Sequence, residues 1–589
     1  MGKNWVIKNK KGDFDAICRE QGITEVTARL LVNRGIMTKE ERDAYLHPSF
    51  ANLHEAGLLK NAKAAATCLK EEIEQGNTIR IIGDYDVDGV VSVYILYRTL
   101  KAAGAKVDYR IPDRKKDGYG INTEMVKECI RDGIRVILTC DNGIAAMEPI
   151  AYARENNIKV VLTDHHEIPL FETEDGMEER MPEADIIVNP KQAGESTPYP
   201  KLCGAVVAYK VMLCLAEMTG LSQEFMKGFL PYAAMATVCD VMELCDENRS
   251  IVILGLQAMK QCNDVGICAL LEENQLDKEH LSAYHFGFVL GPCLNASGRL
   301  DTAEKGLRLL LETDALKAAA LAKEVTELNN IRKAMTQNYV QQARDYYESL
   351  EKLEPVLVHY IPECHESLTG IIAGRIREFF YRPTIVLTDG EEGCKGSGRS
   401  IDGYHMYEEL CGCRELLTKF GGHPKAAGLS LPKENVEAFR QKLLSNCTLT
   451  EEQLCEKIAI DVVLPFGLVT EQVVEELKWL EPFGMGNEKP VFAERNLRVL
   501  QARILGKNAN VLKLKLQNEY GKQFDTVFFG DISGFENELC RCYGAAELDK
   551  MYQGRENRVC FSMLYYPECN EFRGTITLQA VMQDYRFVV

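Results

Sequence analysis

The chain has 589 residues, of which 46% are hydrophobic and 26% charged, and its formal net charge is −18. This composition is typical of a soluble globular protein, and the length favours three to five domains. The start of the chain shows no apolar signal core, and no apolar run is long enough to cross a bilayer, so we expect no membrane association. The acidic balance argues against an indiscriminate nucleic-acid coat protein, but it leaves room for a nuclease with a local basic groove.

The 21 cysteines are scattered through apolar segments, and no C-x-x-C pair occurs. The two close pairs, Cys411/Cys413 and Cys540/Cys542, have the wrong spacing for a zinc or iron–sulfur knuckle. We therefore expect buried, reduced thiols and a cytoplasmic protein.

Residues 1–55 predict a small helical lead-in, with Thr24 and Thr38 as candidate N-caps. From about residue 56 to 240, apolar runs alternate with helical patterns, which indicates a doubly wound, mostly parallel sheet in a domain that extends to residue 302. The predicted strands are residues 78–82, 106–111, 134–140, 158–163 and 184–188. In such a sheet, ligands bind beyond the carboxyl ends of the strands.

The first of these strands runs into a turn with an aspartate at every second position, and Gly89 then opens a helix that we expect to be amphipathic. Three carboxylates so close repel one another, so the physical reason to place them together is a multivalent cation. The alternatives are an acidic surface turn or a calcium loop, although the distant glutamate of a calcium loop is absent. The three aspartates are Asp84, Asp86 and Asp88.

Three further apolar runs, each predicted to be a strand, also end in acidic residues, and together with the first they predict one site. Carboxylates with one or two imidazoles and no thiolate suit Mn²⁺ or Mg²⁺ better than structural Zn²⁺, and the imidazole favours Mn²⁺. So many carboxylates favour two ions with a bridging aspartate, an arrangement that promotes in-line attack on a phosphodiester. The three segments are DNG at 141–143, DHH at 164–166 and TVCD at 237–240.

Several motifs resemble the DHH phosphoesterase family. GDYDVDG at 83–89, CDNG at 140–143 and DHH at 164–166 look like its signature. Residues 111–120 resemble its P-x-R-x-x-E-G-Y-G loop, with Asp117 where Glu is usual, and NASGR at 295–299 resembles its N-A-x-G-R motif. GSGRS at 396–400 and GGHPKAAG at 421–428 resemble the DHH-associated second domain. From about residue 60 to the end, their order resembles the single-strand-specific 5′→3′ exonucleases of this family.

The resemblance implies a role for each of two sets of residues. The implied metal ligands, which are also catalytic, are Asp86, Asp88, Asp141, His165 and Asp240, with Asp84 close by as a further candidate. His166 is implied to act in catalysis by contacting the scissile phosphate. The implied substrate-binding residues are Arg114, Asn295, Arg299, Ser397, Arg399 and His423.

The arginines of this set suit bidentate phosphate contact, and we expect each of them to lie in a glycine-rich turn. The alternative for an isolated arginine is a solvated surface charge. Two departures from the family pattern weaken neighbouring contacts: Cys364 stands where Trp is common, and Cys293 stands where Arg is common.

The rest of the chain predicts a connector and two smaller domains. Residues 303–350 predict one or two connector helices, with a helix buried in the first domain as the alternative. Residues 351–454 predict a small α/β domain, with strands at 355–360 and 383–388 beside a helix at 370–380. Its glycine-rich turns would let the backbone approach a polyanion closely.

Residues 455–589 predict about five strands, enough for a small barrel, and the resemblance implies an OB-fold that binds single strands. Residues 511–516 alternate strictly between leucine and lysine faces, and a hairpin turn follows at 518–521. Three aromatic residues are candidate stacking platforms, although core packing is expected for at least half of them. They are Tyr520, Phe528 and Phe529.

The leading hypothesis is a metal-dependent exonuclease of DNA repair and recombination, which degrades single-stranded DNA from its 5′ end to 5′ mononucleotides with two Mn²⁺ or Mg²⁺ ions. Single-stranded DNA, a helicase and a single-strand-binding protein are its candidate partners. One alternative is a DHH phosphodiesterase of short oligonucleotides or cyclic dinucleotides. Another is a non-catalytic strand-binding scaffold, as in the replication-helicase relatives of the family.

Overall fold

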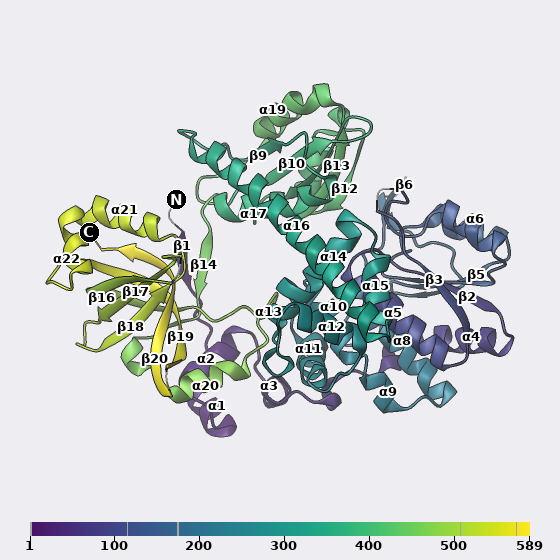
Figure 1. Cartoon of the computed structure of the whole chain (residues 1–589), viewed down its shortest axis with the longest axis horizontal. Coiled ribbons are helices and arrows are strands. Elements are labelled where there is room, and N and C mark those ends of the chain that lie inside the picture. The colour runs from purple at the N-terminus through teal and green to yellow at the C-terminus, as the bar shows by residue number, and fades with distance from the viewer. Residues whose placement is uncertain (1–2, 115, 174–175, 507, 573, 589) are drawn as a thin grey trace. The chain divides into compact units, whose positions relative to one another are not determined.

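Figure 1 shows a computed structural model of the chain, which describes residues 3–114, 116–173, 176–506, 508–572 and 574–588. Lys115, in the predicted loop at 111–120, lies outside the described residues. The chain divides into two compact units, the larger formed by Pro48–Cys455 with Gly484–Gly486, and the smaller by the remaining residues. Among the described helices, none combines the length and apolarity that crossing a membrane would need.

The larger unit contains the predicted parallel sheet, with the strand order β3-β2-β4-β5-β8. Every neighbouring pair is parallel, so all five carboxyl ends share one edge. The strand order reverses between β2 and β4, and in doubly wound sheets ligands bind at this switch point. The strands are β2 (Thr78–Ile82), β3 (Lys106–Arg110), β4 (Val136–Cys140), β5 (Lys159–Thr163) and β8 (Ile186–Val188).

Helices cover both faces of this sheet, which confirms the doubly wound prediction. Ile79 and Ile81 of β2 pack with α4, α5 and α8, while Ile137 of β4 packs with α6 and α7. The helix after the aspartate turn, α5, is buried on nearly all sides, so the prediction of an amphipathic helix was wrong: α8, α10 (Leu230–Cys239) and α15 (Glu304–Leu311) pack against it. The helices are α4 (Ala62–Glu74), α5 (Val87–Ala102), α6 (Thr123–Arg131), α7 (Met147–Glu155) and α8 (Gly204–Thr219).

A layer of helices follows the sheet, and its first members correct one strand prediction. The segment before Asp240 is α10 (Leu230–Cys239), and Asp240 is its C-cap rather than a strand end. A short apolar run does not distinguish a strand from a buried helix, and the alanines in this run favour a helix. The layer continues through α11 (Asp246–Met259), α12 (Val265–Glu273) and α14 (Gly291–Leu300).

The predicted connector consists of two helices, α15 (Glu304–Leu311) and the 34-residue α16 (Ala315–Glu348). Helix α16 packs against α12 and α14 at one end and against α17 (Thr369–Phe380) at the other (Figure 1).

A second sheet, with the order β12-β13-β11-β10-β9, follows α16. The two glycine-rich segments predicted as turns lie in its strands β11 and β12–β13, so that prediction was wrong. Strand β11 packs against α17, and a Cβ at Gly370 of α17 would lie 2.7 Å from Nη2 of Arg399, so the glycine permits a close approach. The strands are β9 (Leu357–Tyr360), β10 (Thr384–Asp389), β11 (Cys394–Arg399), β12 (Lys419–His423) and β13 (Ala426–Leu431).

The smaller unit contains the predicted barrel, because its five strands follow the order β16-β17-β18-β20-β19 and a β16–β19 pairing closes the ring. Leu512, Leu514 and Leu516 are buried, as their alternation predicts. Of the three candidate platforms, only Phe528 packs in the core, whereas Tyr520 and Phe529 are exposed. The strands are β16 (Phe492–Leu505), β17 (Val511–Gln517), β18 (Gln523–Phe528), β19 (Cys560–Phe572) and β20 (Thr575–Phe587).

The start of the chain belongs to the same unit as the barrel. Strand β1 (Asn4–Ile7) pairs with β14 (Lys457–Ile460), and Leu30 and Leu31 lie in the same core cluster as the barrel leucines. Thr24 and Thr38 cap the helices that begin at Glu25 and Lys39, as predicted. Local periodicity carries no information about such long-range pairing, so the sequence did not reveal it.

A buried ion pair inside the helical layer offers a test of this packing. Nζ of Lys210, on α8, lies 2.7 Å from Oε1 of Glu247, and both side chains are at most 3% exposed. We expect Lys210→Met to destabilise the larger unit by about 3–5 kcal/mol, because it leaves a buried carboxylate without its partner. Urea unfolding measures the change. The double variant Lys210→Met/Glu247→Gln should recover most of the loss, and equal loss in both variants would contradict the ion-pair explanation.

Candidate active site

The aspartates after β2 and β4 lie at the switch point of the first sheet. Asp84 and Asp88 are buried, and Asp86 is the N-cap of α5, where its Oδ1 accepts a hydrogen bond from Gly89 N at 3.1 Å. Asp141 follows β4 directly and is also buried. The parallel register of β2 and β4 therefore brings carboxylates from two separate segments to one place.

The amino end of α8 binds the Asp88 carboxylate. Its two oxygens accept hydrogen bonds from Gly204 N at 2.6 Å and Ala205 N at 2.8 Å. A helix N-terminus stabilises an anion, so this contact holds a charge that burial would otherwise disfavour. A Cβ at position 204 would lie 2.7 Å from Cβ of Asp141, so glycine is needed for α8 to come this close.

Asp164 organises the histidine pair after β5. Its Oδ1 accepts hydrogen bonds from the backbone N–H groups of His165 and His166 and lies 2.8 Å from Nδ1 of His166, while its Oδ2 accepts one from Ile144 N. Burial alone would raise the pKa of Asp164, but its contact with His166 holds that pKa below the usual value. Asp164 is therefore an ionised anchor for the two rings.

The two neighbouring histidines have opposite electrostatic environments. Burial lowers the pKa of His165 to about 3, so its ring is neutral and can donate a lone pair to a metal. Burial also opposes charge on His166, but the contact with Asp164 raises the pKa of His166 to about 9. Nε2 of His165 lies 3.1 Å from Asp141 Oδ1 and 3.7 Å from Asp240 Oδ2.

The candidate ligand atoms form three overlapping groups, in each of which they lie within 4.8 Å of one another. Asp141 and His165 each belong to two of these groups, which suits two neighbouring ions with a shared ligand. The groups are Asp84/Asp86/Asp141, Asp88/His165/Asp240 and Asp141/His165/His166.

The electrostatics of these groups also fit divalent cations. Burial, followed by repulsion from neighbouring aspartates, raises the pKa of Asp88 to about 6 and that of Asp240 to about 8, and it raises the pKa values of Asp84 and Asp141 well above normal. Oδ1 of Asp84 is buried and has no hydrogen-bond partner among the described residues. A divalent cation would compensate these charges, and the oxygen and imidazole donors are those that Mn²⁺ and Mg²⁺ accept.

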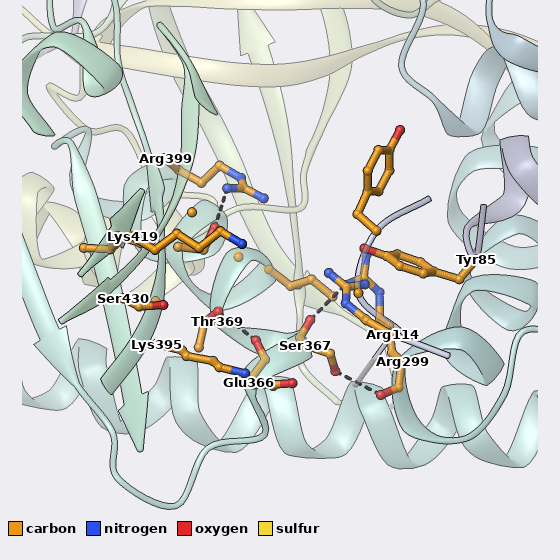
Figure 2. Close-up of a pocket in the computed structure, with 18 residues that line it drawn as sticks. Tyr85, Arg114, Arg299, Glu366, Ser367, Thr369, Lys395, Arg399, Lys419 and Ser430 are labelled. Carbon is orange, nitrogen blue, oxygen red and sulfur yellow. Dashed lines mark hydrogen bonds and ion pairs between the residues drawn. The ribbon is translucent and has the colours of Figure 1, made fainter. Parts of the chain in front are cut away.

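A cavity of about 720 Å³, which we call the phosphate cavity, lies between the first sheet's loops and the second sheet. Figure 2 shows Arg399 and Lys419 extending into it from one side, and Tyr85, Arg114 and Arg299 from the other. The one carboxylate among the described lining residues, Glu366, pairs with Lys395 at 2.9 Å. The lining cations are Arg114, Arg299, Lys395, Arg399 and Lys419.

Hydrogen bonds hold the guanidinium groups in place. Nη1 of Arg399 donates to Oγ of Ser397 at 2.8 Å, and Nη1 of Arg299 donates to the Ser367 carbonyl at 2.8 Å. The Arg114 guanidinium lies 4.8 Å from the centre of the Tyr85 ring. Burial lowers the pKa of Arg299 to about 10, which still leaves it charged at neutral pH. Fixed guanidinium groups suit the oxygens of a phosphate.

Tyr119 connects the phosphate cavity to the metal-ligand groups. It lines the cavity, its hydroxyl lies 3.2 Å from the ring nitrogens of His166, and it donates to the Asp141 carbonyl at 3.1 Å. The lining of the cavity is therefore in direct contact with the segments that carry Asp141 and His166.

The structure brings together most of the predicted site residues. Arg114, Arg299, Ser397 and Arg399 all line the phosphate cavity, but Arg299 lies on helix α14 and Arg399 ends strand β11, so Arg114 alone of the three arginines lies in a loop. Oδ1 of Asn295 accepts from Val87 N at 3.2 Å, and Asn295 does not line this cavity. His423 is exposed and does not line it either.

Sequence reasoning missed several residues of the site. It gave no role to Asp164 or Tyr119, although both stand inside quoted motifs. Lys419 begins strand β12, and no local pattern marks it as a cavity residue, whereas Lys395 begins the basic, glycine-rich stretch 395–400 that was expected to bind phosphate. The two cysteines that depart from the family pattern both lie in the protein interior. Cys364 lies in a core cluster, and Cys293 is buried with its Sγ accepting a hydrogen bond from Nδ2 of Asn329 at 3.3 Å.

Family models match three parts of the chain. The DHH family N-terminal domain matches residues 78–237, the DHHA1 domain matches residues 353–448, and the RecJ OB domain matches residues 460–584. These ranges contain the first sheet, the second sheet and the barrel except for the end of β20.

Curated proteins named single-stranded-DNA-specific exonuclease RecJ match over most of the chain. The protein of Bacillus subtilis is 36% identical, with 89% of this chain and 65% of that protein covered. The protein of Dickeya dadantii is 34% identical, with 94% and 95% covered, and that of Escherichia coli is 31% identical with the same shares. The chain thus spans about two thirds of the first relative and nearly all of the other two.

Solved structures give the same result. RecJ of Thermus thermophilus in complex with Mn²⁺ is similar with a TM-score of 0.80 and 26% identity, covering 99% of this chain and 79% of that one. Its complex with Mg²⁺ has a TM-score of 0.75 at the same identity, covering 99% and 78%. Given the match to nearly the full length of relatives above 30% identity, the chain belongs to the RecJ family of DHH proteins.

Proposed function

We propose that the chain is a metal-dependent exonuclease that hydrolyses single-stranded DNA from its 5′ end and releases 5′ mononucleotides. The observation that carries this proposal is a carboxylate–histidine cluster that adjoins a cavity lined by five cationic side chains. Relatives named single-stranded-DNA-specific exonucleases support it. The barrel supports a long strand as substrate over the alternative of a short or cyclic oligonucleotide.

Asp84, Asp86 and Asp141 would hold one divalent ion, and Asp88, His165 and Asp240 the other. Two bound ions of this kind supply an activated water and stabilise the oxygens of an in-line displacement at phosphorus. Asp84 is included as a ligand because its buried Oδ1 has no other partner among the described residues.

His166 would act on the phosphate that is cleaved. Its ring is protonated at neutral pH because of Asp164, and its Nδ1 lies 3.9 Å from Asp141 Oδ1, at the edge of the cluster. An imidazolium in this position can hydrogen-bond to a phosphate oxygen and stabilise charge that develops there. Tyr119 and Asp164 would orient the ring.

The phosphate cavity would bind the terminal 5′ phosphate through Arg114, Arg299, Ser397 and Arg399. A terminal phosphate carries more negative charge than an internal diester, so a cluster of cations favours the strand end over its interior. This preference would make the enzyme an exonuclease.

We further propose that the enzyme acts in the cytoplasm in DNA repair and recombination, with a helicase and a single-strand-binding protein that deliver its substrate. Free thiols throughout the described chain suit a reducing compartment. The exposed rings of Tyr520 and Phe529 on the barrel unit would stack on bases of the strand.

Removal of a proposed metal ligand tests the mechanism. We expect Asp86→Ala and His165→Ala each to lower the rate of Mn²⁺-dependent degradation of a 5′-phosphorylated single strand by at least about a thousandfold, because each removes a ligand of a reaction-promoting ion. Asp132→Ala, at an exposed aspartate outside the cluster, is the matched control and should cut at the wild-type rate. A wild-type rate in either ligand variant would refute the mechanism.

Recognition of the 5′ phosphate can be tested at Arg399. We expect Arg399→Gln to raise the KM for a 5′-phosphorylated strand by about ten- to a hundredfold, since a charged hydrogen bond is lost. The KM for a 5′-hydroxyl strand should change much less. Arg414→Gln, at an exposed arginine of the same domain, provides the control. Equal effects on both strands would mean that the cavity does not read the terminal phosphate.

Metal binding should be linked to pH through the buried carboxylates. Because the folded-state pKa of Asp88 is about 6 and that of Asp240 about 8, against 3.8 without the fold, protonation of these groups favours the metal-free fold at low pH. The stability that protonation of Asp88 and Asp240 adds to the metal-free protein is fully present below pH 3.8 and is lost as the pH rises through 6 to 8.

Melting temperatures with chelator and with Mn²⁺ measure this linkage. The metal-free protein should melt at lower temperature at pH 8 than at pH 6, and the gain from Mn²⁺ should be larger at pH 8. A gain that does not vary with pH would contradict the assignment of these carboxylates as ligands.

A further inference from the structure

The turn that ends α10 holds a valine in a backbone conformation that favours glycine. Asp240 is the C-cap of α10, and Val241 follows it with a φ of +56°. The backbone N–H of Val241 donates to the Val238 carbonyl at 3.2 Å, and that of Met242 donates to the Thr237 carbonyl at 3.1 Å. These two bonds form a Schellman motif, in which the left-handed residue is usually glycine because a Cβ is unfavourable there.

A valine at this position is unusual within the chain itself. Helices α4, α5 and α6 end in the same pair of hydrogen bonds with glycine as the left-handed residue, and α7 does so with asparagine. Among the described non-glycine residues with positive φ, Val241 alone has a β-branched side chain, which makes it an outlier of backbone conformation. The residues at the matching positions are Gly76, Gly104, Gly133 and Asn157.

Packing within the protein does not offset this strain. Val241 is 64% exposed, so its side chain buries little apolar surface against the rest of the chain. Glycine would form the same turn at lower cost, because it adopts the left-handed conformation without a clash. A strained residue whose side chain is left in solvent points to a role in function.

The position of Val241 beside the metal-ligand groups indicates what that role is. Its neighbour Asp240 shares a group with Asp88 and His165, and Oδ2 of Asp240 lies 3.7 Å from Nε2 of His165. The Asp240 side chain is 27% exposed, so the cluster is open to solvent at this residue. Consecutive Cα atoms are about 3.8 Å apart, so a nucleotide whose phosphate is held at Asp240 can contact the Val241 side chain.

We propose that Val241 is a substrate-contacting residue, whose two methyl groups pack against a nucleoside that flanks the cleaved phosphodiester. Such an apolar contact makes no demand on the hydrogen-bonding groups of a base, so it tolerates every sequence. The contact explains why the turn carries a branched side chain instead of glycine. This inference rests on the proposed function, in which the ions hold the phosphate that is cleaved.

Three substitutions of Val241 test the proposal with a 5′-phosphorylated dinucleotide, which has both flanking nucleosides and no further strand. We expect Val241→Gly to raise the melting temperature by about 1–3 °C, because it relieves the strain, and yet to raise the KM about five- to tenfold, because it removes the contact. Val241→Ala should raise the KM to a similar extent, whereas Val241→Ile keeps a branched apolar side chain and should stay within about twofold of wild type.

Two results would overturn the proposal. A wild-type KM in Val241→Ala, with a loss only in Val241→Gly, would show that the backbone and not the side chain matters. A lower melting temperature in Val241→Gly would show that the valine is held by packing within the protein.

Helix α12 provides a matched control, because it ends in the same motif far from the cluster in sequence. Gln275 has a φ of +55°, and its N–H donates to the Glu272 carbonyl at 2.9 Å, while that of Leu276 donates to the Leu271 carbonyl at 2.9 Å. Gln275 is exposed and does not line the phosphate cavity. Gln275→Gly should therefore raise the melting temperature without changing the KM. A KM raised as much as in Val241→Gly would contradict a local contact.

Binding without cleavage separates this inference from the proposed function. With Ca²⁺ in place of Mn²⁺, calorimetry should show that Val241→Gly binds the dinucleotide about five- to tenfold more weakly than wild type and binds inorganic phosphate equally well. If wild-type protein cleaves neither dinucleotide nor longer strand, the proposed function fails, while this comparison still decides on the contact. Equal weakening for both ligands would show that Val241 acts through Asp240, and it would overturn the proposal, as would unchanged dinucleotide binding.

Discussion

Crowding of buried carboxylates at one edge of the first sheet is the constraint on which the rest of the site depends. Parallel pairing of β2 with β4 brings these groups together, and their mutual repulsion would oppose folding without compensation. Two of them are compensated within the chain, since Asp88 binds the amino end of α8 and Asp164 accepts several N–H groups. Asp84, Asp141 and Asp240 keep raised pKa values, and so does Asp88 despite its contact with α8, so these four are the groups that call for cations.

The contact with Asp164 also explains why the pKa of His166 is raised while that of the adjacent His165 is lowered. A single carboxylate, Asp164, fixes the backbone of both residues but touches the ring of His166 alone. One imidazole is therefore kept neutral inside the cluster, while its neighbour is kept charged at the edge. A metal ligand would need a neutral imidazole and a phosphate contact a charged one: burial keeps His165 neutral, and the contact with Asp164 keeps His166 charged.

The sequence predicted the sheet, the barrel and most site residues because each depends on a local signal. Strand periodicity, carboxylates after apolar runs and motif order are all visible within a few residues. Prediction from the sequence failed where contacts between distant parts of the chain determine the local structure. Asp240 follows a helix whose sequence resembles a buried strand, glycine-rich β11 is a strand because β10 and β13 pair with it, and β1 pairs with a strand more than 400 residues away. Lys419 enters the cavity through sheet geometry that no local pattern encodes.

The distribution of charge determines where a nucleic-acid strand can bind to this chain. The chain has a net charge of −18, so attraction of a nucleic-acid strand depends on places where cations gather. In the larger unit, the phosphate cavity is such a place, and Tyr119 connects its lining to Asp141 and His166 of the cluster. Arg299 is one of the five cations that line it. Because its guanidinium is held by the Ser367 carbonyl, the strand would have to adapt to the protein rather than the reverse.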